Sequence, residues 1–151
     1  MSAETHGLHN SAHERILQRV DLVLKAAGTD AAARVHRGRV DAFGADEIPA
    51  INVRRSTGQA DAFAHAVTRG LMEFELDFHV RGDDWETAAD RLHLQAHRVI
   101  AVDGELNTLG RGLRCVRTEP RAEGGDETIG RLTATYQVQT LSRAGDLSLV
   151  T

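Results

Sequence analysis

The chain has 151 residues, of which 41% are hydrophobic and 26% charged, and its formal net charge is −4. This length is typical of one domain with a sizeable core. The negative charge disfavours a general nucleic-acid binder, which needs a clustered basic surface. No apolar run approaches the roughly eighteen residues that cross a bilayer, and the polar segment 1–10 lacks the apolar stretch of a secretion signal. We expect a flexible extension over residues 1–10, a single domain over 11–151, no membrane contact and no export by the usual route.

The first predicted element is a helix that begins after Ser11. Ser11 and Glu14 have the spacing of a capping box, and apolar residues then recur at helical spacing until Gly28, which predicts a C-terminal stop. A first strand is predicted around residues 35–40. A polar loop over residues 41–47 follows it.

The segment 46–53 predicts the entrance to a second strand. Pro49 has no N–H to donate, so it is tolerated at the first residue of a strand or along a sheet edge, and it favours an extended Ile48. Apolar and polar residues alternate after it, as in a half-buried strand. We expect Pro49 to mark a sheet edge and the small polar residues 56–64 to form a connection.

The clearest strand is predicted over residues 72–81, where five apolar residues alternate with five polar ones: Met72, Phe74, Leu76, Phe78 and Val80 against Glu73, Glu75, Asp77, His79 and Arg81. Asp83 and Glu86 then predict the start of a helix with one apolar face. Two more strands are predicted over residues 113–119 and 129–140, joined by a long loop over residues 120–130. The pattern predicts an α+β fold: a mainly antiparallel sheet of about four to five strands with two helices packed on one face.

The candidate chemical groups favour no catalytic, cofactor or metal site. His93 and His97 are four residues apart on a helix, a spacing that zinc sites use, but we expect them on the solvent face with no third ligand. The carboxylates on one face of the strand 72–81 could do acid–base work in a pocket, although a surface or an interface with Lys or Arg partners fits them better. Cys115 is expected to be a small buried hydrophobe. No segment resembles a nucleophile elbow or a phosphate loop.

The order of these elements resembles that of a known family. The resemblance covers about residues 14–140 and rests on the sequences Glu14-Arg15-Ile16, Glu47-Ile48-Pro49-Ala50-Ile51-Asn52-Val53, Val80-Arg81-Gly82, Trp85-Glu86-Thr87-Ala88-Ala89-Asp90, the turn at Leu106 to Leu109, and Thr135-Tyr136-Gln137-Val138. In this order they look like the tail terminator proteins of long-tailed bacteriophages and prophages, of the lambda minor tail protein U type. The segment 47–53 is its most specific part.

The resemblance implies a structural virion protein without catalysis. Such proteins form a ring, typically of six copies, on the last tier of the tail tube, where they stop polymerisation and offer a surface to the head. The implied partners are further copies of the chain, the tail tube protein and a head-completion or neck protein, with DNA only as cargo in the lumen. The implied location is the head-proximal end of the virion tail, after synthesis in the host bacterial cytoplasm.

A closed head-to-tail ring needs two different complementary surfaces on each copy. We expect strand edges, polar strand faces and long loops to supply them, with these candidate contact residues: Phe43, Asp46, Glu47, Ile48, Glu73, Glu75, Arg121, Glu123, Asp126 and Glu127. The apolar residues Leu147, Leu149 and Val150 near the C-terminus are also available to dock.

Two alternatives stay open. One is another ring-forming neck or tail-completion protein that sits at a different level of the particle. The other is a small enzyme or ligand-binding domain with six polar residues around one cleft: Glu73, Glu75, Asp77, His79, His93 and His97.

Overall fold

The computed structural model describes residues 10–64 and 66–148. Helix α2 (Ala12–Ala26) begins at the predicted cap, where the Ser11 hydroxyl accepts a hydrogen bond of 3.1 Å from the Glu14 backbone N–H. Gly28 follows the helix with a φ of +68°, a left-handed conformation that glycine adopts without steric cost. Both predicted boundaries of this helix are confirmed.

Five strands form one sheet in the order β1-β2-β3-β5-β4. In chain order the strands are β1 (Val35–Arg37), β2 (Ala50–Ala64), β3 (Val67–Arg81), β4 (Arg111–Glu123) and β5 (Ile129–Arg143). β1 pairs with β2 in parallel, and every other neighbouring pair is antiparallel. The predicted α+β fold with a mainly antiparallel sheet is confirmed.

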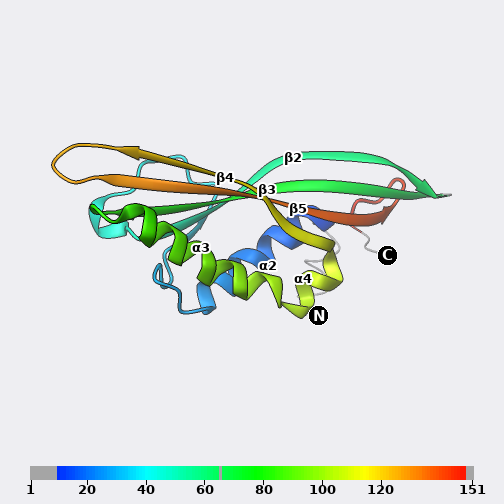
Figure 1. Ribbon diagram of the computed structural model, residues 1–151. Coiled ribbons are helices and arrows are strands. Elements are labelled where there is room, and N and C mark those ends of the chain that lie inside the picture. Colours follow the sequence, from blue (N-terminus) through cyan, green and yellow to red (C-terminus); the bar gives the residue numbers. More distant parts are fainter. Residues whose placement is uncertain (1–9, 65, 149–151) are drawn as a thin grey trace.

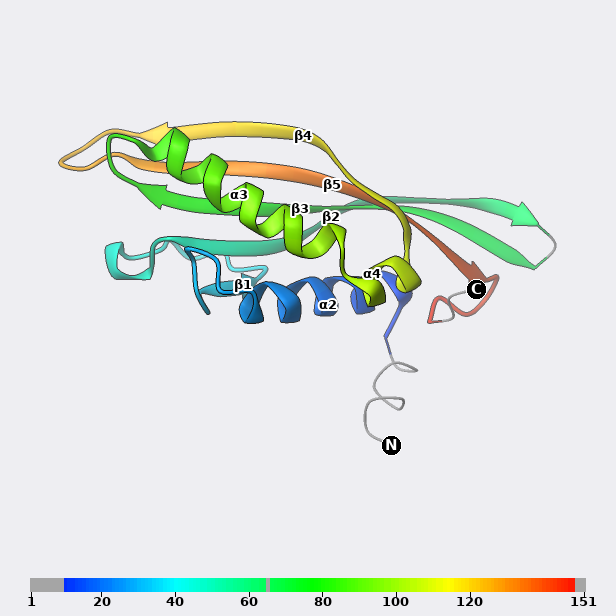
Figure 2. The ribbon, with the colours of Figure 1, turned by 60° about the horizontal axis from the view of Figure 1, so that its bottom comes forward.

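The helices cover one face of this sheet, as Figures 1 and 2 show. α2 and α3 (Trp85–Ala101) lie beneath it in Figure 1, and the short α4 (Gly104–Leu109) follows α3. The predicted apolar face of β3 packs against them, since each of its five apolar side chains is at most 2% exposed. Leu17, Leu24 and Leu92 meet that face from the helices as part of the same core. The opposite face of the sheet carries no helix in the described part of the chain.

Two predictions about β2 are wrong. Pro49 does precede the strand, but the start of β2 is not a sheet edge, because β1 pairs with Ile51–Val53 on its outer side. Residues 56–64 are not a connection: they extend β2 beside residues 67–72 of β3. Most of these residues have little intrinsic strand preference, so hydrogen bonds to the neighbouring strand hold them in the sheet. Together β2 and β3 make a hairpin that projects beyond the helices (Figure 1).

Other predicted boundaries move by a few residues. The first strand ends at Arg37 rather than at residue 40. α3 has Asp84 rather than Asp83 as its N-cap, without a side-chain cap bond. The loop predicted over 120–130 shrinks to residues 124–128, because Pro120 continues β4. Pro120 is tolerated there because β4 is the last strand of the sheet, where a missing N–H costs no ladder bond.

Several expectations concern residues outside the description. Residues 1–9 of the extension predicted over residues 1–10 lie outside the described residues. Leu149 and Val150 also lie outside them. Among the described residues, no helix has the length and apolar character needed to span a membrane.

Candidate functional site

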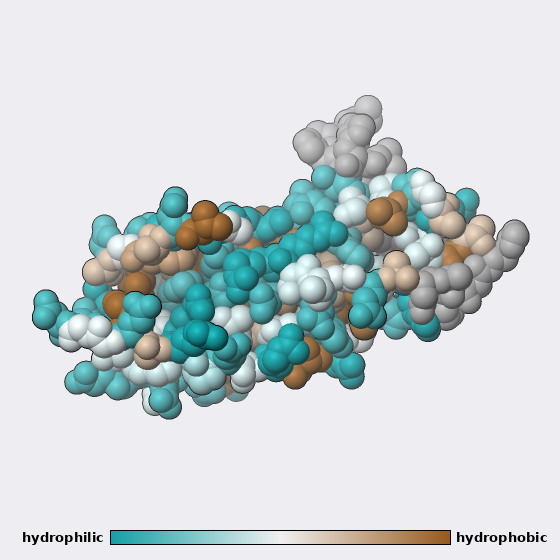
Figure 3. Space-filling model, turned by 90° about the horizontal axis from the view of Figure 1, so that it is seen from above, coloured by the Kyte–Doolittle hydropathy of each residue, from teal (hydrophilic) through white to brown (hydrophobic). Residues whose placement is uncertain are grey.

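The helix-free face of the sheet is polar and internally paired. Figure 3 views this face and shows a mostly hydrophilic surface with separate hydrophobic patches. Arg54 of β2 bonds the Asp77 carboxylate through two nitrogens and lies 3.1 Å from Glu75, while Arg117 of β4 lies 3.5 Å from Glu73. The basic partners expected for these carboxylates therefore come from the same chain.

A groove of about 670 Å³ lies at one end of this face. The loop over residues 39–43 forms one wall, and residues 121–123 of β4 form the other. Asn52, His79 and Arg131 contribute to its lining from three different strands. Polar and apolar side chains thus line the same concave site.

Asn52 holds the wall formed by residues 39–43. Its amide accepts a 3.0 Å hydrogen bond from the Arg39 N–H and donates a 2.8 Å bond to the Arg39 carbonyl. This exchange imitates a strand pairing, and it explains why Asn52, on the polar face, is only 2% exposed. The Arg39 guanidinium in turn bonds Glu47 at 2.6 Å and lies 4.2 Å from the centre of the Phe43 ring.

Phe43 packs between two imidazoles. Its ring centre lies 4.3 Å from that of His79 and 5.2 Å from that of His36. Burial lowers the pKa of both histidines, and that of His79 falls to about 4. Both rings are therefore neutral near pH 7, which suits their contact with an apolar ring.

Two arginines and the neutral His79 form a row across the groove. Arg121 lies directly opposite Arg131, and Arg131 lies directly opposite His79 on the next strand. The Arg121 guanidinium bonds Glu119 at 2.8 Å, whereas the Arg131 Nε is buried and has no hydrogen-bond partner in the described structure. Arg121 and Arg131 are like charges on directly paired residues, which is unfavourable, so an acidic group beside Arg131 would stabilise the pair.

The structure brings some of the predicted contact residues together and leaves others apart. Four line the groove: Phe43, Ile48, Arg121 and Glu123. Glu47 binds Arg39 at its wall, and Asp46 is exposed beside it in the short 3₁₀ helix Ala45–Glu47. The remaining four lie outside the groove: Glu73 and Glu75 farther along the same sheet face, and Asp126 and Glu127 exposed beyond the end of β4.

Sequence reasoning missed Arg39, Asn52 and Arg131 as groove residues. Alternation alone places Asn52 on the polar face, but no local signal shows that a loop covers it. Arg131 becomes notable only through its register with Arg121 and His79, which joins residues far apart in the sequence. Pairing between distant strands is not encoded in either strand separately.

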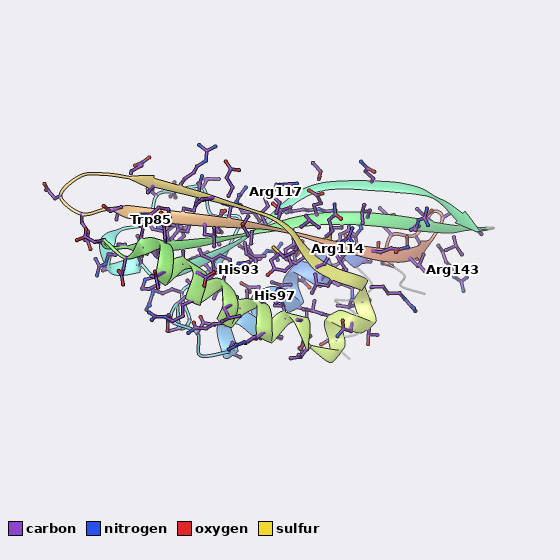
Figure 4. All side chains as sticks on the ribbon, in the orientation of Figure 1. Trp85, His93, His97, Arg114, Arg117 and Arg143 are labelled. Atoms are coloured by element: carbon purple, nitrogen blue, oxygen red, sulfur yellow. The ribbon has the colours of Figure 1, made fainter. Side chains whose placement is uncertain are left out.

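A second polar cluster lies on the helix side of the sheet. The prediction that His93 and His97 face solvent is wrong: one nitrogen of each ring lies 2.9 Å from the Tyr136 hydroxyl of β5. Figure 4 shows both histidines on α3. The hydroxyl lets this face of α3 bury two imidazoles, because it can donate to one and accept from the other. Burial lowers the pKa of His93. No group of three or more potential His, Cys, Asp or Glu metal ligands occurs among the described residues.

Cys115 is half-buried and packs against the core. Its Sγ lies 3.7 Å from the Arg117 carbonyl. This environment fits the expected small hydrophobe, although the side chain is less buried than expected.

His79 predicts a loss of stability in acid. The folded chain holds it with a pKa of about 4, whereas the unfolded chain binds the proton near pH 6.5. Its contribution to folding is therefore complete above pH 6.5, declines as the pH falls and is lost near pH 4. Allowing for its partial exposure, we expect a loss of about 1–2 kcal/mol.

Urea unfolding at pH 7 and pH 4.5 would measure this effect. The His79→Asn variant should lose less stability between these pH values than the wild type, while His13, His36 and His93, whose pKa values are also lowered, act equally in both proteins. An equal loss in the two proteins would exclude His79 as a source of acid sensitivity.

Comparison with known proteins shows no family for this chain. No family model matches the chain, and no curated protein matches it. A similar solved chain comes from a structure described as "Virion of native gene transfer agent (GTA) particle". The two share 15% sequence identity over 85% of this chain and 92% of that chain, with a TM-score of 0.48. A likeness at this level carries no argument.

Proposed function

We propose that this chain is a structural protein of a phage-type tail that assembles as a ring, of six copies, on the end of the tail tube. There it ends tail polymerisation and offers the surface to which a head-completion protein binds. Its partners are copies of itself, the tail tube protein and the neck protein, with DNA passing through the lumen. It acts without a catalytic residue or a cofactor.

One observation carries the proposal: two unlike surface features lie at opposite ends of the same sheet. The groove is lined by residues 121–123 and 129–131 at one end of β4 and β5. The projecting β2–β3 hairpin lies at the opposite end of the sheet (Figures 1 and 2). A cyclic head-to-tail assembly needs such a pair of unlike surfaces. The order of elements that resembles the tail terminators adds to this support.

The six polar residues of the alternative function, a small enzyme or ligand-binding domain, do not form one site. Glu73, Glu75, Asp77 and His79 lie on the helix-free face, whereas His93 and His97 contact Tyr136 on the helix side. The sheet separates the two groups. A different neck or tail-completion ring remains the nearest alternative, and binding to tail tubes distinguishes it from a terminator.

Charge reversal in the loop 41–47 tests the contact surface. Asp41 and Asp46 are exposed, so Asp41→Lys with Asp46→Lys should leave the monomer folded. We expect the double variant to keep its circular dichroism spectrum but to lose ring formation or binding to purified tail tubes. Unchanged assembly and tube binding would remove this loop from the contact surface.

A further inference from the structure

The groove combines two directly paired arginines with exposed apolar side chains. The row Arg121, Arg131 and His79 has a buried guanidinium nitrogen without a hydrogen bond in the described structure. Two apolar side chains that line the same groove are exposed to water, which is unfavourable in free energy. Val40 is 95% exposed and Ile129 is 37% exposed. A complementary segment would bring a carboxylate and several aliphatic side chains.

Such a segment follows β5 in this same chain. Asp146 and Leu147 are exposed, and Leu147 is 64% exposed although it is a large aliphatic residue. Leu149 and Val150 continue the apolar character in the sequence. Residues 146–150 therefore combine one carboxylate with three aliphatic side chains.

This segment cannot reach the groove of its own chain. The backbone of Asp146 forms a β-bridge with Arg143, which lies at one end of β5. Arg131 is twelve residues from Arg143 along the same strand, a separation of about 40 Å. Residues 149–151 add at most about 10 Å. Figure 4 shows the separation, with Arg143 at one end of the molecule and Trp85, which packs on the groove residue Gly130, at the other.

We propose that the groove receives residues 146–150 of a second copy of the chain, with Asp146 against Arg121 and Arg131 and the aliphatic side chains against Val40, Phe43 and Ile129. The inference rests on the proposed ring, for which it names the repeating contact. Groove and segment lie at opposite ends, so every copy gives one segment and receives one. Such a heterologous contact repeats around a ring.

The lining of the groove favours a polypeptide over DNA as its occupant. Asp41 and Glu123 line it together with the arginines, so its charge is mixed and it lacks the uniformly basic surface that a phosphate backbone needs. The exposed aliphatic rim adds nothing to phosphate binding. An acidic, aliphatic segment satisfies both kinds of lining.

Single substitutions on the two sides test the contact. Arg131→Glu reverses the charge in the groove, and Leu147→Asp places a charge on the segment. Each should raise the protein concentration needed for assembly about tenfold or more, measured by light scattering after size exclusion. Arg114→Glu, on the exposed part of β4 outside the groove, and Leu22→Asp, at a residue 56% exposed on α2, are the matched controls and should assemble as the wild type does.

Mixing the two variants gives the decisive result. Arg131→Glu keeps an intact segment and Leu147→Asp keeps an intact groove, so the mixture should form heterodimers that stop at two copies. Heterodimers also prove that both variants are folded. A mixture that stays monomeric under conditions where the wild type assembles would overturn the contact.

The remaining outcomes separate this inference from the proposed function. If the wild type forms rings and both variants do so equally well, the groove contact is wrong and the ring stands. If Arg131→Glu weakens binding to tail tubes but not self-assembly, the occupant is the tube protein and the inference fails. If the wild type never assembles and never binds tubes, the proposed function itself fails.

Discussion

Replacing Arg54 with methionine should lower the free energy of unfolding by about 3 kcal/mol at pH 7. The Asp77 side chain is only 4% exposed, and Arg54 is its cationic partner. Burial alone would raise the pKa of Asp77, but hydrogen bonds from Arg54 and from the Thr133 hydroxyl outweigh burial and lower it. Without Arg54 a buried carboxylate keeps only the neutral donor Thr133, so burial then dominates. Urea unfolding of the two proteins measures the difference.

The loss in the Arg54 variant should depend on pH. Asp77 in the wild type stabilises the fold above its ordinary pKa, and this contribution fades as the pH falls through the lowered value. In the variant the carboxyl takes up its proton at a higher pH, which relieves the buried charge. The stability difference should therefore shrink toward pH 4.

Arg117→Met is the matched control for Arg54→Met. Arg117 also faces a carboxylate, Glu73, but its side chain is 58% exposed and the distance is 3.5 Å. Exposed ion pairs contribute little, so we expect a change below about 1 kcal/mol. Equal losses in the two variants would show that burial of Asp77 does not set the cost.

Removing the Tyr136 hydroxyl is the second large effect. Tyr136 is fully buried, and its hydroxyl is the hydrogen-bond partner of both His93 and His97. Tyr136→Phe keeps the ring, which stacks on Phe74 at 5.4 Å, but leaves two half-buried imidazoles without this partner. We expect a loss of about 2 kcal/mol, measured by thermal or urea unfolding.

A double-mutant cycle tests whether the stability lost in Tyr136→Phe comes from the two imidazoles that lose their hydrogen-bond partner. In a His93→Leu, His97→Leu background no imidazole is left to satisfy, so Tyr136→Phe should cost less than about 1 kcal/mol. The same cost in both backgrounds would mean that the hydroxyl acts independently of the histidines.

Local patterns predicted the elements of this fold well. The alternation in β3 identified all five of its buried apolar residues, and the Ser11 cap located the start of α2. These signals act within a few residues. The extension of β2 through residues 56–64 was missed because its hydrogen bonds come from β3 rather than from its own residues.

The candidate site was predictable only in part. The loop 41–47 and Arg121 were chosen separately, and the sheet brings them to the two walls of one groove. The burial of Asn52 and the row that contains Arg131 depend on a covering loop and on cross-strand register. His93 and His97 were placed on the wrong side because the sequence gives no sign that Tyr136 offers them a hydroxyl.

The mass of the purified protein in solution, with negative-stain images of the same sample, tests the ring most directly. The account predicts a species of six copies of the 16.4 kDa chain at high concentration, seen as rings with an open centre. A protein that stays monomeric at every concentration and does not bind purified tail tubes would contradict it.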